Sequence, residues 1–179
     1  MLQRIKRKIG SLLQDPPPAW EITMRLELTV EAQWAGLRDK TRNMIRKHER
    51  LEREVYRDKC FTDAFYTLYH ARMESKGAKA KNYFELFNVL QEEGVELYAE
   101  FDGFILKGGA VVDMRDKESA TWLVGALTSE FLLWEVVKDC IQDQKKCLYL
   151  GRSRAGSGSF YFKRNFCGHF GLIEREERK

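Results

Sequence analysis

Three strand-like segments follow one another between residues 95 and 127, and this succession constrains the fold more strongly than any other feature of the sequence. The first two cover residues 95–101 and 104–114, and the dipeptide Asp102-Gly103 between them is typical of a tight hairpin turn. The third covers residues 121–127, after a polar turn at residues 116–119. We therefore predict an antiparallel meander within the sheet.

The rest of the chain alternates between helical and strand-like patterns. Strands are recognised by alternating apolar and polar residues, and helices by apolar residues spaced three to four apart. Helices are expected at residues 29–51, 62–73, 83–93 and 132–142, and further strands at residues 20–28, 54–57, 147–150 and 169–174. The helix at 132–142 would cross over from the meander to a further strand. We therefore predict an α/β (α+β) fold, with a mixed, mostly antiparallel sheet flanked by helices.

The prolines at positions 16–18 mark the clearest boundary in the chain. Three consecutive prolines cannot continue a helix, and they form a short, stiff spacer. We expect residues 1–18 to be a basic N-terminal segment with a proline linker and residues 19–179 to be a single domain, since 179 residues support one core. Residues 1–13 lack the apolar core of a signal peptide. They would form a terminal helix, belong to a preceding domain or lie on an acidic membrane surface.

The composition limits where the protein is expected in the cell and which kinds of site it can contain. The net charge of +4 permits a polyanionic partner without demanding one. The cysteines form no Cys-x-x-Cys pair and have no histidine at metal-ligand spacing, so we expect reduced thiols and no metal site. No apolar run reaches the length of a transmembrane helix. A cytoplasmic protein is predicted, with peripheral membrane association through the N-terminal segment as an alternative.

Residues 148–164 combine a short apolar strand, a loop rich in Gly, Ser and Arg, and a cluster of aromatic and basic residues. The strand is predicted to stop at Gly151, and the cluster spans residues 160–164. Glycine lets backbone N–H groups approach an anion closely, and arginine forms paired hydrogen bonds to phosphate or carboxylate. An anion-binding loop at the end of a sheet is one interpretation, and an ordinary solvated connection is the other.

Four segments resemble those of one known family. They are KTRNMIRK at residues 40–47, FYTLYHAR at residues 65–72, the hairpin at residues 95–112 and LGRSRAGSGSFYFK at residues 150–163. In this order they resemble the second, acetyltransferase-like (GNAT) half of the Fem-type aminoacyltransferases and of the related FemAB-like and BioF2-like acyltransferases. The resemblance implies a single GNAT-like acyltransferase domain over residues 19–179.

The resemblance also implies acyl transfer from an activated donor to an amine. Aminoacyl-tRNA is favoured over acyl-CoA, because CoA-dependent members carry a glycine-rich, often basic turn where this chain reads GALTSE at residues 125–130. The donor would be a co-substrate, so no bound cofactor is expected. The acceptor would be a peptidoglycan precursor of the cell wall, carried on a nucleotide or a lipid. Since family members usually have two GNAT-like halves, a second half or a second copy of this chain is a further expected partner.

The same resemblance assigns roles to individual residues. Lys163 and Arg152 would be catalytic, with the Lys163 ammonium stabilising negative charge in the transition state. The substrate-binding residues would be Arg42, Asn43, Arg46, Lys47, Arg72, Ser153, Gly158 and Phe162. At helical spacing Arg42 and Arg46 share one face, where they would clamp phosphates or a carboxylate-rich acceptor. An ordinary solvated basic face is the alternative.

Two other functions fit the same residues. A non-catalytic module of this fold would use the same basic surfaces to hold nucleic acid or an anionic sugar-peptide. A CoA-dependent N-acetyltransferase would bind acetyl-CoA in the same domain. The aminoacyltransferase interpretation makes one geometric demand. The ammonium of Lys163 and the guanidinium of Arg152 must converge on one open cleft at an edge of the sheet.

Overall fold

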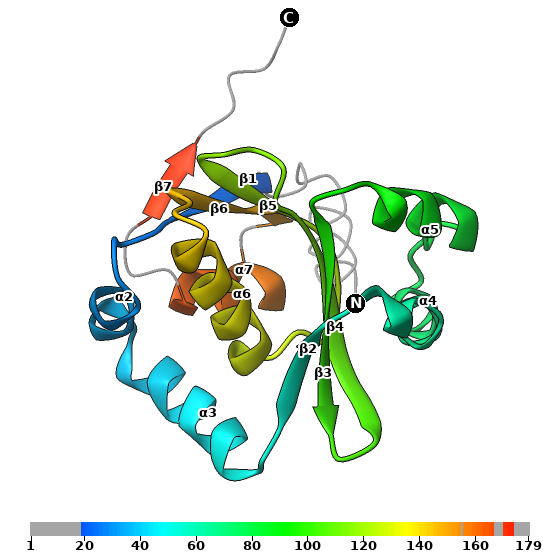
Figure 1. Ribbon diagram of the computed structural model, residues 1–179, viewed down its shortest axis with the longest axis horizontal. Coiled ribbons are helices and arrows are strands. Elements are labelled where there is room, and N and C mark those ends of the chain that lie inside the picture. The colour runs from blue at the N-terminus through cyan, green and yellow to red at the C-terminus, as the bar shows by residue number, and fades with distance from the viewer. Residues whose placement is uncertain (1–18, 155, 167–169, 174–179) are drawn as a thin grey trace, which may run out of the picture.

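A seven-stranded sheet organises the residues that the computed structural model describes, which are 19–154, 156–166 and 170–173 (Figure 1). The strands lie in the order β2-β3-β4-β5-β6-β1-β7. Their bounds are β1 Ala19–Arg25, β2 Glu54–Arg57, β3 Val95–Asp102, β4 Ile105–Asp113, β5 Ser119–Ala126, β6 Cys147–Arg154 and β7 Phe170–Ile173. Every neighbouring pair is antiparallel except β5 and β6, which run parallel. The predicted mixed, mostly antiparallel sheet is confirmed.

Helices cover both faces of this sheet (Figure 1). Their bounds are α2 Val30–Gly36, α3 Asp39–Arg50, α4 Thr62–Ser75, α5 Tyr83–Gln91, α6 Glu130–Gln142 and α7 Gly158–Phe166, with a short 3-10 helix at Lys59–Phe61. One face carries α2, α3, α6 and α7, and the other carries α4 and α5. Because β5 and β6 are parallel, they need a crossover connection, and α6 supplies it.

The core consists of one apolar cluster on each face of the sheet. The larger cluster centres on α6, where Leu132, Val136 and Val137 are fully buried. The smaller cluster packs α4 and α5 against the sheet, with Phe65 and Leu90 fully buried. Burying a side chain of this size contributes about 1.5–3 kcal/mol. These clusters therefore hold both helical layers to the sheet.

The helix predicted at residues 29–51 is two helices. The first ends at Gly36, and the next begins at Asp39. Leu37 between them has extended backbone, with ψ at 148°, and its side chain is only 3% exposed. The break turns the chain so that both Leu37 and Ile45 reach the core. Their burial outweighs the local preference for one continuous helix.

Two further differences concern the C-terminal part of the chain. The sixth strand continues to Arg154, beyond Gly151, where it was predicted to stop. Residues 160–164, predicted only as an aromatic and basic cluster, belong to α7. A helix of nine residues depends on tertiary packing for its stability, and here Phe160 and Phe162 pack against the larger core cluster. That contact cannot be seen in local periodicity.

Gly109 in β4 is a position where the fold leaves no room for a side chain. A Cβ there would lie 2.5 Å from Cδ2 of Phe65 and 3.1 Å from the carbonyl oxygen of Tyr98. We expect Gly109→Ala to lower the free energy of unfolding by about 1–3 kcal/mol, measured by urea denaturation, because the buried Phe65 ring must shift. Gly36→Ala is the matched control, since a Cβ added there would meet no atom within 4 Å apart from its chain neighbours and the backbone of its own helix. Equal losses in the two variants would contradict this explanation.

Candidate functional site

The parallel strands β5 and β6 pair only over their first residues and then separate. The paired residues are Ser119 with Cys147, Ala120 with Leu148 and Thr121 with Tyr149. Beyond this point the register of β5 with β4 shifts at Leu123, and the register of β6 with β1 shifts at Leu150 and Gly151. Gly151 has a φ of 71°, which glycine adopts without strain. Bulges of this kind bend strands, and here the sheet opens between β5 and β6.

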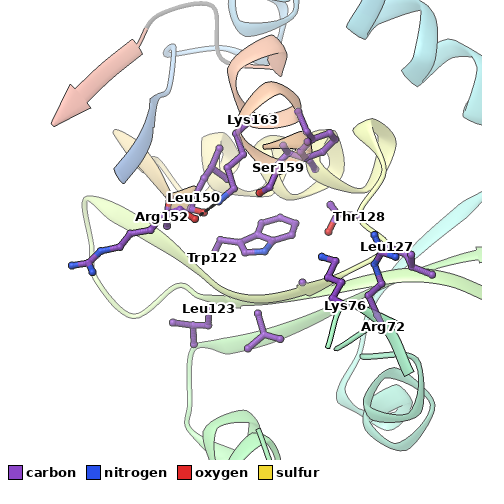
Figure 2. Close-up of a pocket in the computed structure, with 16 residues that line it drawn as sticks. Arg72, Lys76, Trp122, Leu123, Leu127, Thr128, Leu150, Arg152, Ser159 and Lys163 are labelled. Carbon is purple, nitrogen blue, oxygen red and sulfur yellow. Dashed lines mark hydrogen bonds between the residues drawn. The ribbon is translucent and has the colours of Figure 1, made fainter. Parts of the chain in front are cut away.

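A cavity of about 630 Å³ occupies this separation (Figure 2). Its walls are the second halves of β5 and β6, residues 127–128 after β5, the C-terminal end of α4 and one face of α7. Leu133 of α6 closes it from the core side. The cavity therefore lies where elements from both faces of the sheet meet.

Four basic side chains line the cavity, and no Asp or Glu does so among the described residues. Arg72 and Lys76 come from the C-terminal end of α4, one helical turn apart. Arg152 comes from β6 and Lys163 from α7. In Figure 2 the two α4 side chains lie on the opposite side of the Trp122 indole from the other two. Because cations line it from both sides, the cavity favours an anionic ligand over a cationic one on charge alone.

The Lys163 ammonium lies against the backbone of the β6 bulge. It donates a hydrogen bond to the carbonyl oxygen of Leu150, and the carbonyl oxygens of Gly151 and Arg152 lie 3.5 Å from it. The Lys163 side chain is half-buried. The positive charge is therefore part of the cavity wall and is held there by backbone oxygens.

Arg152 meets the geometric demand only in part. Its side chain lines the same cavity as Lys163. In Figure 2, however, its guanidinium extends away from the Trp122 indole and from the Lys163 ammonium. The two charges share one open cleft without converging on a common point, and this cleft lies between two inner strands, not at an edge of the sheet as predicted.

The other residues predicted in the 150–163 segment and on the 65–72 helix fall in two groups. Arg72, Gly158 and Phe162 line the cavity. Ser153 is buried and is not among the lining residues; its hydroxyl oxygen lies 3.1 Å from that of Ser159, which does line the cavity. This hydroxyl pair joins β6 to α7 and fixes the helix that carries Lys163.

The structure places the predicted substrate-binding residues of the 40–47 helix on α3, outside the lining of the cavity. These residues are Arg42, Asn43, Arg46 and Lys47. Arg42 donates hydrogen bonds to the carbonyl oxygens of Trp34 (3.3 Å) and Ala35 (3.1 Å) and pairs with Asp39. The guanidinium of Arg46 lies 5.4 Å from the centre of the Trp34 ring. A substrate-binding role for this group stays a prediction, and two of its arginines join α3 to α2.

Trp122, Thr128 and Lys76 are among the lining side chains that the sequence analysis did not predict. Trp122 is half-buried, and its indole lies across the cavity (Figure 2). A Cβ at Gly125 would lie 2.7 Å from the indole nitrogen and 3.0 Å from the hydroxyl oxygen of Thr128, so the glycine makes room for both. Lys76 follows Arg72 by four residues. That helical spacing is the one signal in the sequence that would have found it.

A buried carboxylate supports the loop between β5 and α6. Glu100 of β3 is fully buried, and it accepts hydrogen bonds from the guanidinium of Arg53 (2.8 Å) and from the hydroxyl of Ser129. Its carboxylate also lies 3.1 Å from Nδ1 of His48. The Ser129 oxygen in turn caps the first turn of α6. The network therefore ties the start of α6, and the cavity wall at residues 127–128, to β3.

Within residues 19–154, 156–166 and 170–173, no group of three or more His, Cys, Asp or Glu side chains is placed to hold a metal ion. Burial raises the pKa of the Cys140 thiol to about 12, which keeps this thiol protonated and unreactive. No helix in the described part of the chain is both long and apolar enough to cross a membrane. The basic N-terminal segment, residues 1–18, lies outside the described residues.

Solved structures share this architecture. No protein-family model matches the sequence, and no curated protein matches it. The structure of FemX matches with a TM-score of 0.72 and 11% identity, over 96% of this chain and 66% of that chain. The C-terminal domain of a protein named as a lysylphosphatidylglycerol synthetase from Agrobacterium fabrum matches with a TM-score of 0.57 and 11% identity, over 76% of this chain and 48% of that chain.

A GCN5-related N-acetyltransferase from Kribbella flavida matches with a TM-score of 0.50 and 11% identity, over 80% of this chain and 32% of that chain. The chain thus spans two thirds or less of the length of each of these proteins. At these identities the likeness concerns the fold. The chain has the GNAT-like fold, which FemX and this N-acetyltransferase share.

Proposed function

We propose that the chain transfers an acyl or aminoacyl group from an activated donor to an amine, in the cavity between β5 and β6. The observation that carries this proposal is the charge of the cavity, with four basic side chains and no carboxylate among its described lining residues. A donor carried on tRNA or CoA is a polyanion with a reactive carbonyl at one end. Such a ligand suits a positively charged cleft. The fold that the chain shares with FemX and with an N-acetyltransferase supports the same class of reaction.

The reaction forms a C–N bond and breaks the ester or thioester bond of the donor. The amine attacks the carbonyl carbon and loses a proton, and the leaving oxygen or sulfur takes up a proton. Between these events the carbonyl oxygen carries negative charge. The Lys163 ammonium, which the carbonyl oxygens of the β6 bulge hold in the cavity wall, places a positive charge beside the proposed position of the donor. That charge would stabilise the developing oxyanion.

The remaining lining residues would bind the donor. Arg72 and Lys76 would hold phosphate groups from the α4 side, opposite Lys163. Arg152, whose guanidinium extends away from the indole, would contact a part of the donor that lies farther from the indole. Phe162 and the Trp122 indole would pack against its apolar or aromatic parts.

Aminoacyl-tRNA suits this cavity better than acyl-CoA. The N-terminus of α6 follows shortly after β5. In CoA-dependent members of the wider acetyltransferase fold, this is the position that holds the pyrophosphate of CoA. Here the Ser129 hydroxyl caps that terminus, and Glu130 places an acidic side chain in its first turn. A helix terminus that is already capped and carries an acid offers little to a phosphate. The cations lie instead on α4, β6 and α7.

The acceptor in this proposal is an amine of a peptidoglycan precursor carried on a nucleotide or a lipid. Since the chain spans 66% of the FemX chain, a second GNAT-like half or a second copy of this chain would complete the acceptor side. The acceptor and the second half are both inferred from the resemblance of the four sequence segments. Both inferences depend on the proposed transfer reaction.

A transfer assay with two donors tests the proposal. The chain is incubated with a nucleotide-linked peptidoglycan precursor and either radiolabelled aminoacyl-tRNA or radiolabelled acetyl-CoA, and the labelled precursor is separated and counted. We expect product from aminoacyl-tRNA and none from acetyl-CoA. Product from acetyl-CoA alone would show a CoA-dependent N-acetyltransferase instead. Salt-dependent binding of tRNA without product from either donor would indicate a non-catalytic binding module.

A further inference from the structure

The Trp122 side chain divides the cavity between β5 and β6. Its indole lies between two groups of cations, with Arg72 and Lys76 of α4 on one side and Lys163 and Arg152 on the other (Figure 2). A donor held by the α4 cations must pass this ring to bring its carbonyl carbon to Lys163. The position of the indole therefore limits which groups reach the Lys163 ammonium.

A bulge in β5 turns the indole to the side of the sheet that carries α6 and α7. Before the bulge, Ala120 and Trp122 contact the larger core cluster, and after it Val124 and Ala126 belong to the smaller cluster on the opposite face. A regular strand would place all four side chains on one face, because side chains alternate with a period of two. The register shift at Leu123 breaks this alternation. The orientation of the indole is thus built into the sheet.

Gly125 leaves the space that the indole occupies. A Cβ at Gly125 would lie 2.7 Å from Nε1 and 3.1 Å from Cε2 of Trp122, and 3.0 Å from the hydroxyl oxygen of Thr128. The φ of Gly125 does not lie in the left-handed region, so its backbone does not itself require glycine. The indole also packs against the larger core cluster. The ring is therefore confined, and any side chain at position 125 has to displace it.

We propose that Trp122 is a specificity-determining residue that limits the size of the transferred group, and that Gly125 positions its indole. The inference rests on the proposed transfer reaction. A small group such as alanyl would pass between the indole and the Lys163 ammonium, whereas an aromatic side chain would meet the ring. In an apolar pocket a difference of one methylene changes relative rates by about 10- to 200-fold, so an indole across the route is sufficient for this selection.

Transfer from two donors that differ only in their acyl group tests the size limit. One tRNA is charged chemically with alanine or with phenylalanine, and kcat/KM for transfer to the same precursor is measured for each. The wild type should favour alanyl-tRNA. Trp122→Leu should lower this preference about tenfold, mainly by raising the rate for phenylalanyl-tRNA. An unchanged preference in this variant would overturn the proposal.

Trp34→Leu is the matched control for the loss of an indole. Trp34 is also half-buried, but it lies on α2, outside the cavity lining. This variant should keep the preference of the wild type even if its thermal unfolding temperature falls. An equal loss of preference in both variants would mean that lower stability, rather than the position of Trp122, changes the selection.

Gly125→Ala tests the positioning role. The added methyl group should move the NMR resonance of the Trp122 indole N–H in the free protein and lower kcat/KM for alanyl-tRNA about tenfold, because the displaced ring narrows the route. In the Trp122→Leu background no atom occupies the places of Nε1 and Cε2, so the same substitution should cost little. Additive losses in the double variant would show that Gly125 does not act through the indole.

Binding of two stable donor analogues separates this inference from the transfer reaction. In each analogue an amide replaces the ester between adenosine and alanine or phenylalanine, and calorimetry gives the dissociation constants. The wild type should bind the alanyl analogue about tenfold more tightly, and Trp122→Leu should lose this difference. That result in a chain that transfers nothing would support the size limit and contradict the proposed function. Equal affinities in the wild type would overturn the size limit, and so would binding of neither analogue by a chain without transfer.

Discussion

Replacing Lys163 with Met should lower the rate constant of acyl transfer by about 10²- to 10³-fold, the loss that follows removal of one preorganised donor to a developing oxyanion. The Lys163 ammonium is half-buried in the cavity wall, where the carbonyl oxygen of Leu150 accepts its hydrogen bond. Met has a similar length and no charge. Single-turnover transfer at saturating donor would report the change, and the loss should appear in kcat more than in KM.

Lys163→Arg is the control for charge. It keeps a cation at this position with a different geometry, so it should retain more activity than the Met variant. Because the ammonium also bonds to the backbone of β6, the free energy of unfolding of each variant has to be measured beside its activity. A folded Met variant with undiminished turnover would rule out the role given to Lys163. Lys163 would then serve only to hold β6 to α7.

Replacing Glu100 with Ala should lower the free energy of unfolding by about 3–5 kcal/mol, the range expected when one partner of a buried ion pair is removed. Glu100 has no exposed surface, and its partner Arg53 has a side chain that is 18% exposed. The Nε of Arg53 has no hydrogen-bond partner in the described structure, and Asp102 approaches this guanidinium only to 3.8 Å. Without Glu100 the Arg53 guanidinium would keep Asp102, at 3.8 Å and on a more exposed side chain, as its remaining ion-pair partner among the described residues. Urea denaturation followed by circular dichroism measures the loss.

Two further variants define the origin of this loss. Glu100→Gln keeps the shape and an acceptor oxygen without the charge, so its free energy of unfolding should lie between those of the wild type and the Ala variant. Glu49→Ala, at an exposed position of α3, should stay within about 0.5 kcal/mol of the wild type. A loss below about 1 kcal/mol for Glu100→Ala would mean that the network of Glu100, Arg53 and His48 contributes little to stability.

The buried network and the cavity are connected through the loop between β5 and α6. The Ser129 hydroxyl donates a hydrogen bond to Glu100 and caps α6, and residues 127–128 beside it line the cavity. Damage to the buried network should therefore also weaken ligand binding. Loss of the Lys163 ammonium should leave the network intact, because Lys163 belongs to the opposite wall.

Much of the architecture could be predicted because local sequence patterns specify it. The Asp102-Gly103 turn sets up the hairpin of β3 and β4, and the crossover helix α6 makes β6 parallel to β5. The chain between α2 and α3 behaves differently. Leu37 leaves the helical conformation to reach the core, and periodicity along the chain does not reveal which apolar residue will do so.

The candidate site likewise contains residues that the sequence indicated and residues that it did not. Resemblance of short segments pointed to Lys163, Arg152, Phe162, Gly158 and Arg72, and these residues do line one cavity. It also placed the α3 group in the substrate site, whereas the structure keeps that group outside the cavity. No sequence signal placed Trp122 in the cavity wall, because a large aromatic residue in a strand is on average highly buried. The register shift beside it, at Leu123, belongs to the pairing of two strands rather than to either strand alone.

By itself, then, the sequence determined most of the elements and their order, together with the basic character of the segments that resemble the Fem-type proteins. Periodicity, turn residues and charge act over a few neighbouring residues, so they can be read along the chain. Only the tertiary structure decided that β5 and β6 separate, that α7 folds onto the opening and that cations from α4 face Lys163 across it. Those relations depend on strand register and on packing between residues far apart in the chain, which no local pattern specifies.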